Sequence, residues 1–113
     1  MTALTPSSFW ILTVLASGRR HGYEIMREAT EASEGSVSLK VATLYAALER
    51  LERDGLLIAD GEEVVAGRNR RYYRLTDAGA TRLAQEVELL ERSAKAARKR
   101  LPSGAVTKGA AWA

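Results

Sequence analysis

The spacing of apolar residues predicts two helices in the first third of the chain. Thr5 followed by Pro6 is typical of a helix start, because threonine caps the first turn and proline fits there without an N–H. The helix that follows is apolar nearly all round until Gly18, so it is expected to have neighbours on more than one side. A second helix with one apolar face is expected to begin near Gly22 and to end before Gly35.

A third helix is expected between Ser38, as its N-cap, and Gly55, which closes it. Leucines at spacings of four and three residues are expected to face the core: Leu44, Leu48 and Leu51. Small or polar residues occupy the opposite face: Lys40, Thr43 and Ala47. The first turn carries no acid, and such a turn suits a helix end that approaches phosphates or base edges.

After Gly55 the apolar period changes to two, which predicts strands at 56–65 and 70–75 joined by a turn at 66–69. Alternation puts Tyr72 and Tyr73 on opposite faces, so at least one of them is expected in the core. The tip of this hairpin is expected to carry a basic cluster: Arg68, Asn69, Arg70 and Arg71. Like charges this close repel one another, so the cluster indicates either a solvated edge or a polyanionic partner. Arg74 is expected to pack along the sheet or to pair with an acid.

Thr76 and Asp77 are expected to cap a last, long helix. Its apolar residues recur every four and three positions and form a heptad seam: Leu83, Val87, Leu90, Ala94, Ala97 and Leu101. One projecting helix cannot bury such a seam on itself, so the pattern predicts a homodimer in which Phe9 and Trp10 share the interface. The alternative is packing of the seam on the first helix of the same chain, and the two arrangements are compatible.

The order helix, helix, helix, hairpin and long helix predicts a winged helix-turn-helix, a mainly α fold with a small β-hairpin. We expect a DNA-binding domain at 1–76, a C-terminal dimerisation helix at 77–101 and a flexible tail at 102–113. In this fold the third helix enters the major groove of double-stranded DNA. The hairpin, called the wing, is then the basic element beside it.

Composition leaves little for catalysis. The chain has 113 residues, a net charge of +3, no cysteine and one histidine, His21. Thiolate sites and a histidine pair for a metal are therefore excluded, and no phosphate-binding glycine loop or nucleophile elbow occurs, so we expect neither an enzyme nor a cofactor. His21 is expected to be a turn residue at the start of the second helix. The apolar N-terminal run is too short to span a bilayer, so we expect a cytoplasmic protein with no membrane partner.

Three motifs also resemble the PadR family of bacterial transcriptional regulators: HGYEI at 21–25, TLYAALERLERDGLL at 43–57 and GRNRRYYRLTDAG at 67–79. They occur in the order and at the separations typical of that family, over roughly residues 8 to 100. The resemblance implies a homodimeric winged-helix repressor that binds a palindromic operator, often beside the gene that it controls. The chain is similar to the short members, in which a single C-terminal helix makes the dimer.

The motifs depart from the family pattern at three places. Val41-Ala42 stands where a proline-glycine pair is usual, Ala46 where proline follows the motif, and Asn69 where the wing usually has proline. Loss of proline loosens the chain locally, so the expected fold is unchanged, but exact contact geometry and operator sequence are not carried over from the family. Some short members bind flat aromatic drugs between tryptophans of the C-terminal helix. That helix has no tryptophan here, so this pocket is not expected, and the sequence does not indicate which effector, if any, is bound.

The expected DNA contacts fall into four groups. Wing arginines are expected mostly on phosphate, and Lys40 and Thr43 in the groove. Asn69 is either a contact or a turn residue in a left-handed conformation. Four further candidates have a structural alternative, as cap, packing or solvated residues: Tyr23, Ser36, Ser38 and Tyr45. The basic run 95–100 is interpreted as a complement to the negative end of its helix rather than as a second DNA patch.

A protein–protein adaptor is the alternative function, because winged helices also bind proteins and a fold does not fix a function. An adaptor is expected to expose a sizeable apolar patch on the third helix. Lys40, Thr43 and Ala47 at that face favour a DNA groove instead.

Overall fold

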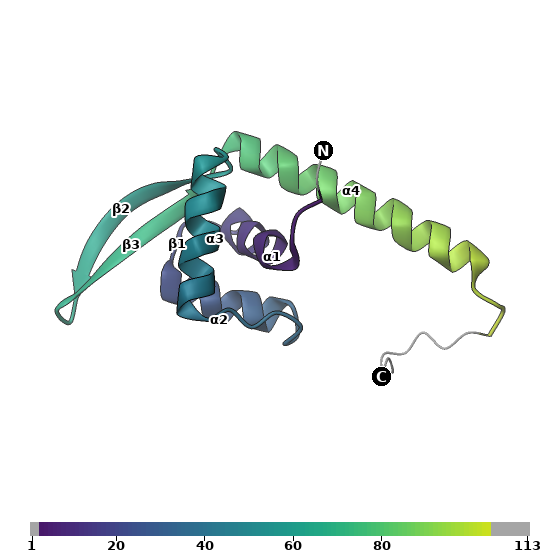
Figure 1. The fold of residues 1–113 in the computed structure, drawn as a ribbon, viewed down its shortest axis with the longest axis horizontal. Helices are drawn as coiled ribbons and strands as arrows, with labels where there is room; N and C mark the ends of the chain where they lie inside the picture. Colours follow the sequence, from purple (N-terminus) through teal and green to yellow (C-terminus); the bar gives the residue numbers. More distant parts are fainter. Residues whose placement is uncertain (1–2, 105–113) are drawn as a thin grey trace.

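The computed structural model describes residues 3–104 and contains four helices and a small three-stranded sheet within that range (Figure 1). The elements follow one another in this order: α1 Pro6–Ala16, β1 Arg20–His21, α2 Gly22–Ala32, α3 Val41–Arg53, β2 Leu57–Val65, β3 Arg68–Leu75 and α4 Asp77–Arg100. This is the predicted winged helix-turn-helix followed by a long C-terminal helix. In the described range no helix is long and apolar enough to cross a membrane.

Side-chain caps set the starts of α1 and α2. The Thr5 hydroxyl accepts a hydrogen bond from the Ser8 backbone N–H at 3.1 Å, as predicted. His21 caps α2: its Nδ1 accepts from the Glu24 N–H at 3.4 Å, while the Glu24 carboxylate accepts from the His21 N–H at 3.1 Å. This reciprocal pair satisfies two backbone donors that the first turn leaves free. His21 therefore lies at the helix start, as the sequence indicated.

The predicted N-cap of α3 is wrong. Lys40, and not Ser38, precedes the first helical residue, and its side chain makes no capping hydrogen bond. The chain before α3 is held instead by Ser33, whose hydroxyl accepts from the Val37 N–H at 3.0 Å. At the other end Gly55 has a φ of +76° and its N–H bonds to the Glu52 carbonyl, which closes the helix as predicted.

The sheet has the order β1-β3-β2 with antiparallel neighbours. The sequence did not predict β1, which pairs Arg20 and His21 with the middle of β3. The predicted four-residue turn is also wrong. Ala66 and Gly67 alone make it, at φ values of +52° and +77°, because a two-residue turn with both φ values positive matches the twist of the strands.

This shorter turn places Arg68 and Asn69 in β3, where they pair with Val65 and Val64. Asn69 is consequently an extended strand residue, and the interpretation of it as a left-handed turn residue is wrong.

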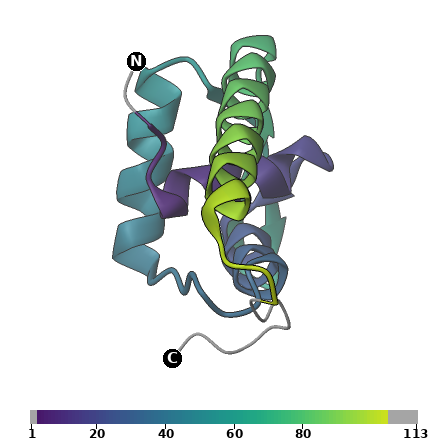
Figure 2. The ribbon, with the colours of Figure 1, turned by 90° about the vertical axis from the view of Figure 1, so that its right-hand side faces the viewer.

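The core lies between α1, α2, α3 and the sheet, and α1 crosses its middle between α3 and α4 (Figure 2). Its largest fully buried side chains come from four elements, α1, α2, α3 and β2: Ile11, Leu12, Ile25, Leu44, Leu48 and Leu57. Tyr73 is the core tyrosine of β3, and Tyr72 is half-buried on the other face. Ala47 is only 2% exposed, so its predicted place on the outer face of α3 is wrong. Burial of a large apolar side chain such as Leu44 or Leu48 stabilises the fold by about 1.5–3 kcal/mol.

Helix α4 packs its first turns on the core and then runs away from it (Figure 1). Thr76 caps the helix. Leu83 and Trp10 pack against the buried cluster, so the start of the seam packs within its own chain, which was one of the two expected arrangements. Farther along, Val87, Leu90 and Leu101 are 39%, 48% and 54% exposed, and Ala94 and Ala97 are exposed as well. Most of the seam is thus uncovered in the single chain. The mobile tail predicted at 102–113 falls largely on residues 105–113, which lie outside the described residues.

Candidate nucleic-acid interface

A hollow of about 330 Å³ lies between the start of α2, one side of α3 and the wing. Six of the nine predicted DNA-contact residues line it, together with His21 and Gly22: Tyr23, Tyr45, Arg68, Asn69, Arg70 and Arg71. These residues come from positions up to 48 apart in the sequence, Tyr23 and Arg71 being the extremes, and only the fold brings them together. The hollow is open and polar, which suits an extended ligand on the surface.

The remaining candidates lie elsewhere on or before α3. Thr43 lines a second hollow of about 470 Å³, shared with the start of α1 and with Arg50. Thr43 and Tyr45 are two residues apart on the helix, so they point about 200° apart around its axis. Lys40 and Ser38 are exposed in the segment that leads into α3. The exposed part of α3 therefore has a Tyr45 side toward the wing and a Thr43 side toward α1.

The wing arginines have different surroundings. Arg71 is partly engaged, because its guanidinium lies 3.9 Å from the Glu52 carboxylate of α3 and 5.6 Å from the centre of the Tyr73 ring. Arg68 and Arg70 are exposed and take part in no ion pair within the described part of the chain. Burial raises the pKa of the Tyr73 phenol, and the charge of Arg71 acts against this shift. Arg68 and Arg70 are thus the arginines most available to an anion.

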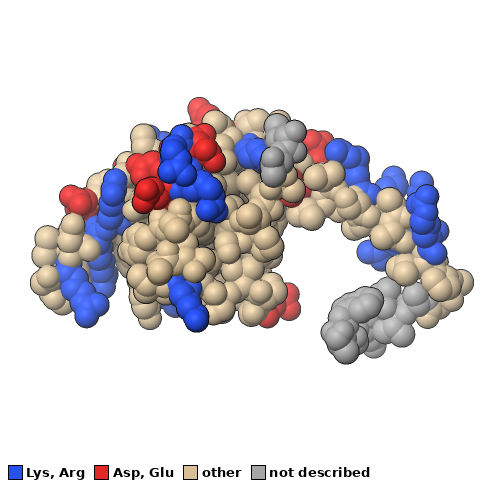
Figure 3. Space-filling view, viewed as in Figure 1, with Lys and Arg blue, Asp and Glu red and all other residues tan. Residues whose placement is uncertain are grey.

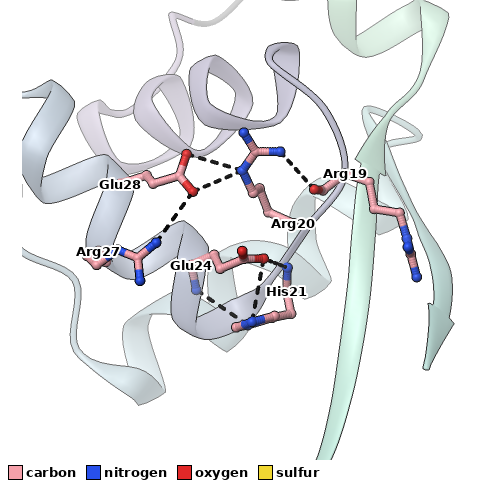
Figure 4. A network of polar contacts seen from close by, with 6 residues as sticks. All are labelled: Arg19, Arg20, His21, Glu24, Arg27 and Glu28. Atoms are coloured by element: carbon pink, nitrogen blue, oxygen red, sulfur yellow. Dashed lines mark hydrogen bonds and ion pairs between the residues drawn. The ribbon is translucent and has the colours of Figure 1, made fainter. Parts of the chain in front are cut away.

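Arginines in and around β1 hold the wing to the rest of the molecule, a role that sequence reasoning missed. Arg19 stacks on the Tyr72 ring at 3.9 Å, and its Nε donates to the Asp60 backbone carbonyl of β2 at 3.0 Å. Arg20 lies 2.9 Å from the Glu28 carboxylate of α2, which also faces Arg27 (Figure 4). In the sequence, only the adjacent pair Arg19-Arg20 pointed to this role. The neighbouring sequence did not indicate which residues the two arginines contact.

Arg74 pairs with Asp60 at 3.9 Å, which is one of the two arrangements expected for it. The space-filling view shows basic side chains on the wing at one end of the molecule and at the far end of α4 at the other (Figure 3). The α4 cluster includes Arg98, Lys99 and Arg100 in the last helical turn, where cations complement the helix dipole. Among residues 3–104 no group of three histidine or acidic side chains is placed to hold a metal ion.

Residues 11–85 match the family model described as Transcriptional regulator PadR-like family. The chain belongs to the PadR-like family. It is 39% identical over 85 residues to the transcriptional regulator Rv3488 of Mycobacterium tuberculosis, a match that covers 75% of this chain and 76% of that protein. Both findings agree with the three motifs, which all lie within or next to the matched segment.

Solved structures give the same result. A PadR family transcription regulator from Clostridium difficile R20291 superimposes with a TM-score of 0.69 at 29% identity, over 84% of this chain and 97% of that one. The Bacillus subtilis PadR protein in complex with operator DNA superimposes with a TM-score of 0.64 at 25% identity, over 71% of this chain and 46% of that one. The PadR-like chain thus has the fold of a family of transcriptional regulators.

Proposed function

We propose that this PadR-like chain is a homodimeric, sequence-specific DNA-binding regulator that represses transcription from a palindromic operator. The observation that carries the proposal is the hollow beside α3, where the exposed arginines of the wing and two tyrosines from two helices surround one open, polar surface. A side chain with a guanidinium or a phenol suits phosphate oxygens, which accept hydrogen bonds and attract cations. The family relation and a relative crystallised with operator DNA support the same assignment.

In this proposal α3 enters the major groove with its N-terminal half. Lys40, Thr43 and Tyr45 are exposed there, and the first turn has no acid that would repel DNA. Thr43 is the residue best suited to a base edge, because its short side chain carries both a hydroxyl and a methyl group. Arg68 and Arg70 contact phosphates beside the groove, and Arg71, Asn69 and Tyr23 line the surface between wing and helix. Ser38 lies in the segment that approaches the backbone.

The dimer is proposed to form through α4. Helix α4 extends beyond the core of its own chain and exposes a row of apolar side chains there: Val87, Leu90 and Leu101. A second copy of the helix covers this row in the way that heptad seams pair. Phe9 and Trp10 pack edge to face at 5.1 Å on α1, a helix that contacts α4, and extend the proposed interface, together with Leu83, Ala94 and Ala97.

A two-fold dimer presents two copies of α3 to successive major grooves, about 34–36 Å apart. A palindromic operator follows from that symmetry, and occupation of such a site next to a promoter represses the gene. Residues 1–76 then form the DNA-binding part and residues 77–101 the dimerisation helix. An effector would act by changing the angle between the two DNA-binding halves, for which the α4 seam is the element with alternative arrangements.

The adaptor alternative requires an extended apolar patch on α3. Val41 and Tyr45 are exposed there, but they alternate with Lys40 and Thr43. This mixture fits base edges and phosphates better than the apolar surface of a protein partner.

Selection from a pool of random-sequence duplexes tests the proposal. We expect enrichment of one sequence with two-fold symmetry, whose half-sites lie about 10 base pairs apart or a multiple of that. Thr43→Ala should change which sequences are enriched. A pool that stays random after several rounds would contradict sequence-specific recognition, and an enriched site without symmetry would contradict the dimer.

A further inference from the structure

The wing carries acids opposite its arginines. From the local sequence the cluster 68–71 is free of acids, but antiparallel pairing sets β2 beside it. Glu62 lies opposite Arg71 and Glu63 lies opposite Arg70. Residues directly opposite each other in an antiparallel pair share a face and lie close together. The hairpin 57–75 therefore holds three acids against four arginines, and its net charge is far lower than the cluster suggests.

A β-bulge creates this register. Between Ala59 and Glu62 strand β2 has one residue more than the facing part of β3. Without the extra residue Glu62 would lie opposite Arg70, and Glu63 would lie opposite Asn69. With it, both carboxylates lie opposite arginines. The bulge includes Gly61, whose φ of +94° is one that glycine adopts without strain.

Glu62 also touches the candidate DNA surface directly. Its Oε1 accepts a hydrogen bond from the Asn69 side-chain amide at 3.1 Å, and Asn69 lines the hollow beside α3. On the same side the guanidinium of Arg71 lies 3.9 Å from the carboxylate of Glu52 on α3. The negative charge thus lies among the groups that are proposed to meet phosphate.

Stability does not account for these acids. They are exposed, and ion pairs on a protein surface contribute only about 0–1 kcal/mol. An acid beside an arginine does lower the positive potential that the wing presents to a polyanion. In a DNA-binding protein that potential sets the attraction to every sequence, including the vast excess of incorrect sites.

We propose that Glu62 and Glu63 limit sequence-independent binding of DNA by the wing. The inference rests on the proposed function. Specificity is a difference between two affinities, so weakening the attraction to all sequences raises specificity when α3 supplies the sequence-dependent part. The wing then adds its full share of binding affinity only at a DNA sequence that α3 also recognises.

The test compares Glu62→Gln, Glu63→Gln and the double variant with the wild type. Glutamine keeps the size of the side chain, and at position 62 its carbonyl oxygen can still accept from Asn69, so the charge alone is removed. Glu88→Gln is the matched control, because it removes the same charge from an exposed position of α4 outside both the seam and the wing. Fluorescence anisotropy would measure the affinity for a random-sequence duplex pool at several salt concentrations, and thermal unfolding would confirm that all variants fold.

Each wing variant is expected to bind the random pool about threefold to tenfold more tightly than wild type, because removal of a carboxylate raises the positive potential that the wing presents to phosphate. The Glu88→Gln control should match wild type. Wing variants that bind like the control, or more weakly than wild type, would overturn the inference. Its failure is separate from that of the proposed function, which fails if the wild type enriches no sequence from the pool.

Discussion

The phenol of Tyr45 on α3 lies directly over the Cα of Gly22 in the first turn of α2. A Cβ at position 22 would lie 2.6 Å from the Tyr45 hydroxyl oxygen and 3.2 Å from the ring carbon that bears it. Glycine at this position therefore lets the tyrosine lie across the gap between the two helices. Because Tyr45 is 47% exposed and lines the hollow beside α3, the contact sets the shape of the proposed DNA surface.

Gly22→Ala is expected to displace the Tyr45 ring without unfolding the protein, because the atom that must move is the outer end of an exposed side chain. The affinity for the selected duplex should fall about threefold to thirtyfold, while the free energy of unfolding changes by less than about 1 kcal/mol. Tyr45→Phe removes the nearest atom, so Gly22→Ala should cost less affinity in that background. Equal losses in both backgrounds would show that Gly22 does not act through the Tyr45 hydroxyl.

Gly79→Ala is expected to destabilise the fold strongly. A Cβ on Gly79 would overlap the backbone carbonyl oxygen of Leu56, and the main chain between α3 and β2 cannot move aside as a flexible side chain could. We expect a loss of at least about 2 kcal/mol in the free energy of unfolding, although alanine favours a helix over glycine by about 1 kcal/mol. Urea unfolding would measure it. Ala80→Gly, at the exposed next position, is the control and should cost only about 1 kcal/mol. A more stable Gly79→Ala variant would contradict the close approach.

Removal of single wing arginines should separate free from engaged cations. Arg68→Ala and Arg70→Ala are each expected to weaken binding to all sequences and to flatten the salt slope by about one unit. Arg71→Ala should flatten it less, since Glu52 already lies 3.9 Å from that guanidinium. Anisotropy titrations across salt concentrations measure these slopes, with Arg92→Ala on α4 as a control of equal charge. An unchanged slope for Arg70→Ala would remove it from the phosphate contacts.

Leu90→Glu is expected to dissociate the proposed dimer while leaving the chain folded. Leu90 is 48% exposed in the single chain, so the fold itself does not depend on burying it. Sedimentation equilibrium should show a monomer, and the affinity for a palindromic duplex should fall because one copy engages a single half-site. Gln85→Glu adds the same charge on the side of α4 away from the seam and should remain dimeric. If Leu90→Glu stays dimeric, the interface lies elsewhere.

Local signals predicted most of the fold. Thr5, Thr76 and Gly55 marked helix ends correctly because caps and left-handed residues act within one turn of chain. Ala47 was placed on the wrong face although the signal was present. Leu44, Ala47, Leu48 and Leu51 form the complete i, i+3, i+4, i+7 series of a buried face, and the alanine belonged with the leucines.

The parts that could not be predicted depend on contacts between distant segments. Strand β1 has two polar residues and exists because β3 offers it an unpaired edge. The register that sets Glu62 opposite Arg71 follows from a bulge of one residue, which leaves no trace in an apolar pattern of period two. In the candidate site, residue type and position along the chain were enough to predict six of the residues that line the hollow beside α3. The sequence could not show that Arg71 would be shared with Glu52 or that Asn69 would bond to Glu62.

Fluorescence anisotropy with the DNA directly upstream of the protein's own coding sequence tests the central claim most directly, against scrambled DNA of equal length at several salt concentrations. A specific regulator is expected to bind the upstream DNA saturably, with roughly a thousandfold preference or more at physiological salt. If the operator lies elsewhere, the duplex enriched by selection replaces the upstream DNA in the same measurement. Equal, weak binding to specific and scrambled DNA that vanishes as salt rises would contradict the account, because the wing would then supply nonspecific attraction alone.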